Sequence, residues 1–442
     1  MLCNWGFLFM TDTDFQPYLK ETLVKTDLVS QMNSLARKVQ NVQSVFKQEA
    51  FRPDVNKHLR RFSTKEAADL IPTSSSYLLK LSKENPSLTP EIEVVGSRYF
   101  YSLNDINKIR EHLYTTTNKS QYRRKRPEGS DICVVSPHVF KGGASKTTTC
   151  LHLGHYLAMQ GYRILMIDLD GQASLTTMFG YDSVEDFKGS DPDDPRMGTV
   201  FTALNRSILE WEEGNGQKSL STDFSDVIQK TYFPGIDLVG CNLTVADIDF
   251  QVPLAQMKSR THGAFDLHKL ISSGIDSVKD DYDIVIIDSP PAMNYISMAA
   301  LYSADISIVP VRASILDFSS VGLYFDLLCQ ILETFNSSRS INKNLFALKV
   351  LPAVVKPQDQ NQMLIVDIMK DNFGNHMMDN FTVESTMLAF TGLSFQSLYE
   401  ISKPDNRQTY QRALTPFNAV NKEIEGIIQN FWGTKSLLVE KA

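Results

Sequence analysis

Residues 132–149 decide the fold of this chain, and they read Ile-Cys-Val-Val-Ser-Pro-His-Val-Phe-Lys-Gly-Gly-Ala-Ser-Lys-Thr-Thr-Thr. The apolar run Ile132–Ser136 predicts a buried strand, and Cys150–Met159 predicts a helix. Between them, a glycine pair lets the backbone curl so that several amides point at one anion. The positive end of the following helix points to the same place. The stretch therefore predicts a strand, a phosphate-binding loop and a helix.

Short apolar runs recur after this stretch, and helical segments separate them. Runs that are apolar on both faces are typical of a parallel sheet covered by helices on both sides. We therefore predict an α/β fold with a mostly parallel sheet, preceded by a small helical winged helix-turn-helix domain and an N-terminal helix. The strands are expected at Ile132–Ser136, Arg163–Asp170, Ile236–Val239, Ile284–Asp288, Ile306–Val311 and Leu345–Val355.

Acidic residues end two of the predicted strands. Asp168-Leu-Asp-Gly-Gln172 closes one, and Asp283-Ile-Val-Ile-Ile-Asp-Ser-Pro-Pro291 places Asp288 at the end of another. In the loop, Lys146 is placed to reach the β and γ phosphates, and the Thr147 hydroxyl to ligate Mg²⁺. The pattern predicts a site for a nucleoside triphosphate and Mg²⁺.

The loop departs from the G-x-x-x-x-G-K-[ST] pattern, because Phe140 and Ser145 stand at its two glycine positions. What remains is K-G-G-x-x-K-T, the deviant Walker A motif, and the chain resembles the ParA/MinD family of P-loop ATPases. Asp168–Gln172 resembles the D-x-D-P-Q motif of that family, with Gly171 in place of proline. Asp283–Pro291 resembles its Walker B motif. The resemblance covers roughly residues 130–435.

The larger, plasmid-type ParA proteins share two further features with this chain. A serine recurs at the position of Ser145, and an N-terminal helix-turn-helix extension precedes the ATPase domain. The resemblance to this subclass therefore covers nearly the whole chain, and it implies a DNA partition ATPase with ATP/ADP and Mg²⁺ as cofactors.

The resemblance also implies roles for individual residues. Lys141 is expected to cross a homodimer to the nucleotide of the partner, Lys146 to neutralise charge, and Asp170 to position the attacking water. Asp168 would support Mg²⁺ through its waters, while Thr147 and Asp288 belong to the Mg²⁺ shell. The residues expected to bind nucleotide are Lys141, Gly142, Gly143, Ala144, Ser145, Lys146, Thr147 and Thr148. For the adenine, the family suggests the loop around Lys356 and Pro357.

The expected partners follow from the same resemblance. Without a strong base, hydrolysis should be slow until a ParB-type protein, bound to a centromere-like DNA site, completes the active site. The ATP dimer is expected to bind DNA non-specifically, and the winged helix to repress its own operon. This predicts a cytoplasmic, nucleoid-associated protein that does not bind membranes.

The charge of the chain is unevenly distributed. Residues 1–129 carry 20 basic and 14 acidic residues, whereas the remainder carries 24 and 37, within a net charge of −7. A basic region suggests contact with a polyanion. Surface charge that varies along the chain without any function would give the same counts.

The five cysteines form no C-x-x-C pair, which argues against zinc or iron–sulfur sites and favours a reducing cytosol. No apolar run is expected to span a membrane.

Residues 51–120 predict a winged helix-turn-helix DNA-binding domain. Ser63 or Thr64 caps a first helix that Pro72 ends, and a second helix starts within Thr73–Ser76. Val94–Tyr101 predicts the wing, and Leu103–Leu113 a third helix. The candidate DNA-binding residues are Ser74, Ser75, Tyr77 and Lys80 near bases and Arg98 on a phosphate. A helical packing module would give the same pattern.

The remaining segments are assigned more simply. Apolar residues spaced 4, 3, 4, 3 and 4 apart, from Leu28 to Phe46, predict a helix within residues 1–50. It is either a dimerisation helix or an amphipathic helix that packs on its own domain. Residues 121–130 predict a basic linker, and residues 131–442 the ATPase domain. Near the C-terminus, the candidate contacts to bulk DNA are Lys403, Arg407, Arg412 and Lys422. A solvated helix face would give the same pattern. Met10 is a second candidate start.

Two other functions stay open at this point. A MinD-like membrane-associated positioning ATPase needs a basic amphipathic C-terminal helix. The segment Ile424–Ala442 is partly acidic, which favours core or dimer packing of its apolar face. A DNA-binding regulator that uses nucleotide only as a switch would share the loop but not the turnover. ATP hydrolysis stimulated by a ParB partner separates these functions.

Overall fold

The computed structural model describes residues 28–50, 57–189, 194–214, 219–262, 265–339, 344–402 and 406–439. The chain divides into two compact units, Met1–Asn56 and Lys57–Ala442. In the first unit, α2 (Leu28–Ala50) confirms the helix predicted from the heptad spacing. Its role, in dimerisation or in packing, stays a prediction.

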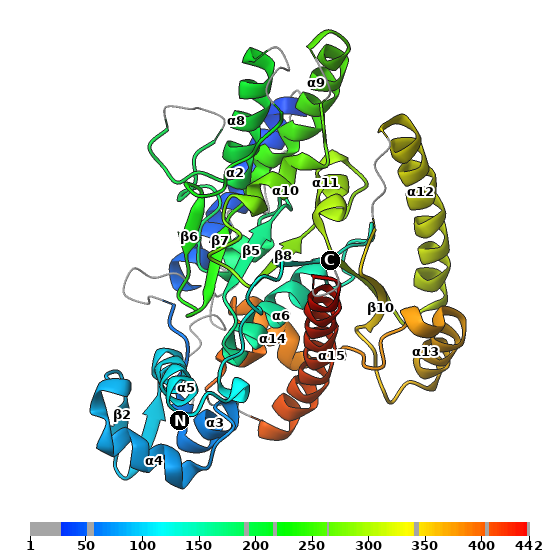
Figure 1. The fold of residues 1–442 in the computed structure, drawn as a ribbon. Helices are drawn as coiled ribbons and strands as arrows, with labels where there is room; N and C mark the ends of the chain where they lie inside the picture. The colour runs from blue at the N-terminus through cyan, green and yellow to red at the C-terminus, as the bar shows by residue number, and fades with distance from the viewer. Residues whose placement is uncertain are drawn as a thin grey trace. The chain divides into compact units, whose positions relative to one another are not determined.

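Within the described residues, a seven-stranded sheet forms the centre of the second unit (Figure 1). The strand order is β10-β9-β4-β8-β5-β7-β6, and β6 runs antiparallel to β7 while the other neighbours are parallel. All six predicted strands are present; β6 was not predicted, because it has three residues and pairs only at the edge. The strands are β4 (Cys133–Pro137), β5 (Ile164–Asp168), β6 (Ile228–Lys230), β7 (Ile236–Val239), β8 (Ile284–Asp288), β9 (Ile306–Arg312) and β10 (Ala347–Ala353).

Helices cover both faces of this sheet. Successive side chains of a strand point to opposite faces, and in β4 Val134 belongs to one buried core while Cys133 and Val135 belong to the other. The first core includes residues of α8 (Val200–Glu213), α9 (Ile248–His262), α10 (Lys269–Asp276), α11 (Tyr295–Ser303), α12 (Ile315–Arg339) and α13 (Gln360–Phe373). The second includes residues of α6 (Lys146–Gln160), α7 (Ser174–Met178) and α15 (Arg407–Val439). The predicted fold class is confirmed.

The helix α15 buries its apolar face in the protein. Ile424, Ile428, Phe431 and Trp432 are all buried in the second core, which confirms core packing for these residues. One helix of the described residues departs from the expectation that no apolar run is long enough for a membrane span: Ile315–Glu333 of α12 is long and apolar enough by length and composition alone. However, Val321 and Tyr324 of that helix pack into the first core.

Helices and strands appear where the sequence predicted a winged helix-turn-helix domain, and the assignment to that domain type stays a prediction. They are β1 (Phe62–Ser63), α3 (Thr64–Leu70), α4 (Ser75–Glu84), β2 (Glu93–Val95), β3 (Arg98–Tyr101) and α5 (Leu103–Thr117). Ser63 caps α3, and Ser74 caps α4. Gly96 turns the wing with a φ of +63°, which glycine adopts without strain. The remaining short elements are α14 (Thr386–Leu393) and the 3-10 turns Pro86–Leu88, Ser120–Tyr122, Leu243–Asp247, Gly374–His376 and Leu398–Glu400.

Arg110 of α5 fastens the winged elements to the sheet domain. Its buried guanidinium donates to the carbonyl oxygens of Leu70, at the end of α3, and Met159, near the end of α6, at 2.8 and 2.6 Å. Burial lowers the pKa of Arg110 to about 9. In the predicted basic linker, Arg124 pairs with Glu425 of α15 at 2.7 Å. The two predicted domains therefore pack together within one compact unit.

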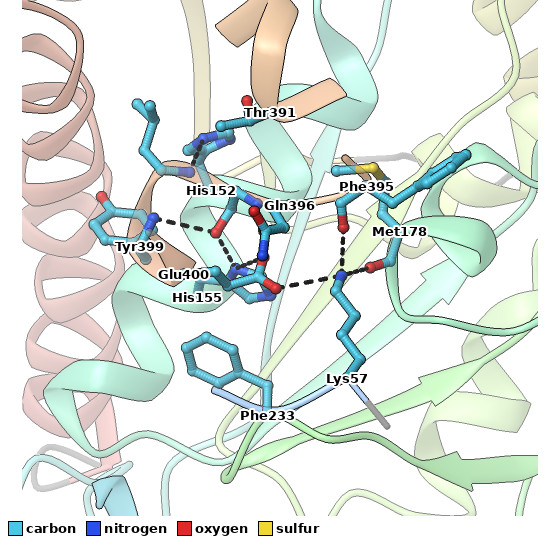
Figure 2. A network of polar contacts seen from close by, with 12 residues as sticks. Lys57, His152, His155, Met178, Phe233, Thr391, Phe395, Gln396, Tyr399 and Glu400 are labelled. Atoms are coloured by element: carbon cyan, nitrogen blue, oxygen red, sulfur yellow. Dashed lines mark hydrogen bonds and ion pairs between the residues drawn. The ribbon is translucent and has the colours of Figure 1, made fainter. Parts of the chain in front are cut away.

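A buried polar network ties α6 to the segment before α15 (Figure 2). Glu400 accepts hydrogen bonds from the Tyr232 hydroxyl at 2.7 Å and from the Ser397 amide at 2.6 Å. The Lys57 ammonium lies 3.3 Å from the same carboxylate. The His155 ring of α6 lies 2.7 Å from the Ser397 hydroxyl. An ion pair and hydrogen bonds thus hold together the start of the second unit, α6 and residues 397–400.

Candidate nucleotide-binding site

The phosphate loop lies between β4 and α6, as the sequence predicted. The predicted start of the helix at Cys150 was wrong, because α6 begins four residues earlier, at Lys146. The three consecutive threonines favour extended structure by local propensity, whereas packing against the sheet makes them helical. The earlier start places Lys146 and Thr147 in the first turn, where unpaired amides point toward the loop.

Two residues of the loop have a left-handed backbone conformation. Gly143 has a φ of +72° and Ser145 a φ of +69°. Glycine adopts this conformation without strain, whereas a side chain costs about 1–2 kcal/mol. An added Cβ at Gly142 would meet nothing within 4 Å, so the inner side of the loop is open.

Lys146 lies folded over this loop. Its side chain is buried, and its ammonium donates to the carbonyl oxygens of Val139 at 3.1 Å and Lys141 at 3.5 Å. Burial lowers the pKa of Lys146, and the charges of Asp288 and Asp170 oppose that shift. The ammonium is therefore close to the position that an anion bound by the loop amides would take.

Two buried carboxylates lie beside the loop. Asp168 and Asp288 stand opposite each other in the register of β5 and β8. Asp168 accepts hydrogen bonds from the amide and hydroxyl of Thr176, at 2.9 and 2.7 Å, and from the Asp170 amide at 3.1 Å. By contrast, Oδ2 of Asp288 is buried and has no hydrogen-bond partner among the described residues. Burial raises the pKa of Asp288, and the charge of Asp168 raises it further.

These side chains fit a Mg²⁺ ion that is shared with phosphates. A buried carboxylate oxygen without a partner is costly unless it meets a cation. In nucleotide sites, Mg²⁺ takes one or two protein oxygens and completes its shell with phosphates and water. Accordingly, no group of three or more His, Cys, Asp or Glu side chains that could hold a metal occurs in the described part of the chain. Asp288 and Thr147 fit direct ligation, whereas the engaged carboxylate of Asp168 fits only an indirect role.

A cavity of about 480 Å³ opens over the loop. Its wall brings the predicted residues 142–148 together with Asp170. The sequence analysis missed the opposite wall, and the suggested residues Lys356 and Pro357 do not line the cavity. That wall consists of Arg312, Val354, Thr382, Val383, Glu384, Ser385, Leu388, Ala389 and Phe417.

Among the missed residues, Arg312 could have been predicted from its position in the sequence. Arg312 directly follows the apolar run that predicts β9, so it had to lie at the same sheet edge as the loop. Its Nε donates to the Gly143 carbonyl at 3.0 Å. Of the other missed residues, Leu388 and Ala389 lie in α14 and Phe417 lies in α15, whereas Val354 and residues 382–385 lie in connecting segments. Only the folded chain brings these segments to the cavity.

Lys141 lies apart from this cavity. Its ammonium pairs with Asp317 of α12 at 2.6 Å. It lines a second cavity of about 280 Å³, between the loop and α12.

The predicted DNA-binding residues do not line the cavity over the phosphate loop. Ser74 caps α4, Tyr77 is 44% exposed, and the exposed Lys80 pairs with Glu84 at 3.7 Å. Ser75 is half-buried in the first turn of α4, and Arg98 is exposed at the start of β3. Arg407 and Arg412 are exposed on α15 with Lys422, whereas Lys403 lies outside the described residues.

Comparison with known proteins identifies the family. A sequence profile of the AAA domain matches residues 132–346. A candidate replication protein A of Sinorhizobium fredii (strain NBRC 101917 / NGR234) is 31% identical over 412 residues, covering 92% of this chain and 95% of that protein. The chain belongs to the ParA/MinD family of P-loop ATPases.

One further relative and one solved structure are similar to this chain. The chromosome partitioning protein ParA of Caulobacter vibrioides (strain NA1000 / CB15N) is 26% identical over 243 residues, or 54% of this chain and 76% of that protein. A solved structure described as a partition protein has a TM-score of 0.60 at 17% identity, covering 92% of this chain and 99% of that one. The solved structure shares the fold of this ParA/MinD protein.

Proposed function

We propose that this protein is an ATP-hydrolysing DNA partition protein that dimerises on ATP, binds DNA and acts with a ParB-type partner. The observation that carries the proposal is the cavity over the phosphate loop, in which residues 142–148 face Asp170. The name of the Caulobacter relative, a chromosome partitioning protein, supports the cellular role. The exposed winged elements of the same unit support DNA binding.

In this proposal the loop amides, the first turn of α6 and Lys146 hold the triphosphate. Thr147 and Asp288 hold Mg²⁺, which would supply charge neutralisation at the phosphates. The base lies against the apolar part of the wall, where Val354 and Phe417 line the cavity. Because phosphoryl transfer depends mainly on positioning and electrostatics, these groups suffice to bind and polarise ATP.

The hydrolytic step depends on Asp170, which positions the water for in-line attack. Its carboxylate accepts a hydrogen bond from the Gln172 amide at 3.0 Å, which fixes its orientation toward the cavity wall. Lys141 of a second protomer completes the charge neutralisation. Turnover is therefore slow in the monomer and rises when a dimer, DNA and the ParB-type partner come together.

DNA binding involves two surfaces in this proposal. The exposed end of α4 and the wing at Arg98 bind an operator, through which the protein represses its own operon. Arg407 and Arg412 bind phosphates of bulk DNA in the ATP dimer. Binding by phosphate contacts releases counterions, so the affinity for bulk DNA falls steeply with salt. The protein thus works in the cytoplasm on the nucleoid.

ATP turnover with and without DNA and the cognate ParB-type protein tests the proposal. We expect slow hydrolysis that both additions stimulate, and Lys146→Ala should lower it by about 100-fold or more. An unchanged rate in Lys146→Ala would show that the activity comes from another site. Turnover that never rises with the partner would favour the nucleotide-switched regulator instead.

A paired substitution tests the bulk-DNA surface. Replacing Arg407 and Arg412 together with alanine should weaken ATP-dependent binding to random DNA and reduce the salt slope by about 2. Alanine at the exposed Lys279 and Lys370 serves as the charge-matched control. Equal binding by both double variants would remove the two arginines from the surface.

A further inference from the structure

The second lysine of the loop, Lys141, is held by its own protomer. Its ammonium lies 2.6 Å from Oδ1 of Asp317, in the first turn of α12. The Asp317 side chain is 12% exposed and that of Lys141 48%. The Ser314 hydroxyl also hydrogen-bonds the Asp317 carboxylate. The lysine is therefore the more mobile member of the pair, and the aspartate is the fixed one.

A second contact attaches the same part of the loop to α12. The Phe140 ring packs edge-on against Tyr324, with ring centroids 4.6 Å apart. The Tyr324 hydroxyl lies 2.7 Å from Nδ1 of the buried His138. Asp317 and Tyr324 are seven residues apart, so they lie two turns apart on one helix face. The backbone that carries Lys141 is thus held at both contacts.

Lys141 has one ammonium on a flexible stem, and it binds as a point charge. It cannot remain on Asp317 of its own α12 and also extend to a nucleotide held by a second protomer. We propose that Asp317 is a positioning residue that holds Lys141 on its own protomer and so restrains ATP-dependent dimerisation. This inference rests on the proposed ATP dimer, in which Lys141 crosses to the partner.

The size of the restraint follows from the exposure of the pair. Half-exposed ion pairs are weak, and releasing one corresponds to about a threefold change in an equilibrium constant. A symmetric dimer must break two such pairs. Removing the restraint should therefore raise the dimerisation constant about tenfold.

The test compares Asp317→Asn with wild type by sedimentation equilibrium in Mg²⁺ and a non-hydrolysable ATP analogue. We expect Asp317→Asn to dimerise about tenfold more tightly, and Asp317→Glu, which keeps the charge, to remain near wild type. Asp326→Asn is the matched control, because Asp326 is an exposed carboxylate of the same helix. Thermal unfolding of each variant checks that the fold is intact.

A structural role for Asp317 would give a different result. The Asp317 amide donates to the Ser314 hydroxyl at 3.1 Å, so the aspartate also helps to cap α12. A capping effect persists in a Lys141→Ala background, whereas the proposed restraint vanishes there. A persistent effect, or a dimerisation constant equal to or weaker than wild type in Asp317→Asn, overturns the inference. Wild type that never dimerises with the analogue would instead refute the proposed ATP dimer.

Discussion

Glu400 and Asp288 are both carboxylates withdrawn from water, but the regions around them differ. Glu400 accepts hydrogen bonds from Tyr232 and Ser397. Its counter-charge is the Lys57 ammonium (Figure 2). Asp288 keeps one oxygen without a hydrogen-bond partner among the described residues. The first region is complete within the chain and serves stability. In the second, the unpaired oxygen is the group that the proposed function assigns to Mg²⁺.

Breaking the Glu400 network should have the largest effect on stability. Glu400→Gln removes the counter-charge of Lys57, and an uncompensated buried charge is expensive. We expect the free energy of unfolding to fall by about 3 kcal/mol, measured by urea denaturation. Glu384→Gln is the control, because that glutamate pairs with Lys356 at an exposed position. A loss below that of the control would mean that the network is not a source of stability.

The same chemical change at Asp288 should act in the opposite direction. Asp288→Asn removes a buried carboxylate whose pKa is raised by burial and by Asp168, and which the charge of Lys146 only partly offsets. The nucleotide-free protein should therefore become more stable by about 1 kcal/mol. The stabilisation by Mg²⁺-ATP should be lost, which near 100 times the Kd corresponds to about 2.7 kcal/mol. Thermal unfolding with and without Mg²⁺-ATP measures both effects. Retained stabilisation by the ligand would exclude Asp288 from the magnesium site.

Acidification should weaken the core around α6. His152 is fully buried; its Nδ1 lies 2.8 Å from the Thr148 carbonyl, and its Nε2 accepts from the Leu398 amide at 3.2 Å. Burial lowers the pKa of His152 from 6.5 to about 4. The folded state thus binds fewer protons than the unfolded state between these values. Stability is complete above pH 6.5 and is lost as the pH falls toward 4.

At pH 5 this residue alone should cost about 2 kcal/mol. Urea denaturation at pH 7.5 and pH 5.0 measures the loss, and His152→Gln should reduce the difference between the two conditions by that amount. The exposed His376, replaced in the same way, serves as the control. An unchanged difference in His152→Gln would show that other groups govern the acid response.

The smallest effect is expected inside the phosphate loop. Ser145→Gly relieves the left-handed strain at position 145, but it also makes the unfolded chain more flexible. We expect a gain of less than about 1 kcal/mol in unfolding free energy, with nucleotide binding retained. Destabilisation by more than this amount would give the Ser145 hydroxyl a structural role.

The sequence predicted most of the fold because its signals are local. The six strands are short apolar runs, and the winged elements carry capping serines and a turn glycine at the right spacing. The helix α8 was not predicted. It begins after Thr199, and the residue that completes its capping box is Thr202 rather than the Glu or Gln that marks such a box in a sequence. The edge strand β6 has too few residues to leave a pattern.

Local signals also allowed part of the candidate site to be predicted, namely the phosphate loop and the acidic residues at the strand ends. Its chemistry lies in contiguous motifs, so Lys146, Asp170 and Asp288 could be named from the sequence alone. The other wall of the cavity comes from residues 382–389 and Phe417, which are far apart in sequence and carry no motif. Such a wall exists only once β10 and α15 have packed.

The sequence alone determined a strand, a glycine-containing loop and a helix that together present amides and an ammonium to a phosphate. This arrangement is local, because 18 neighbouring residues encode it. Only the tertiary structure decided that Asp288 would keep an unpaired oxygen, that Glu400 would meet Lys57, and that Lys141 would rest on Asp317. Each of these three features depends on burial and on contacts between distant segments, and none of them is a property of a local pattern.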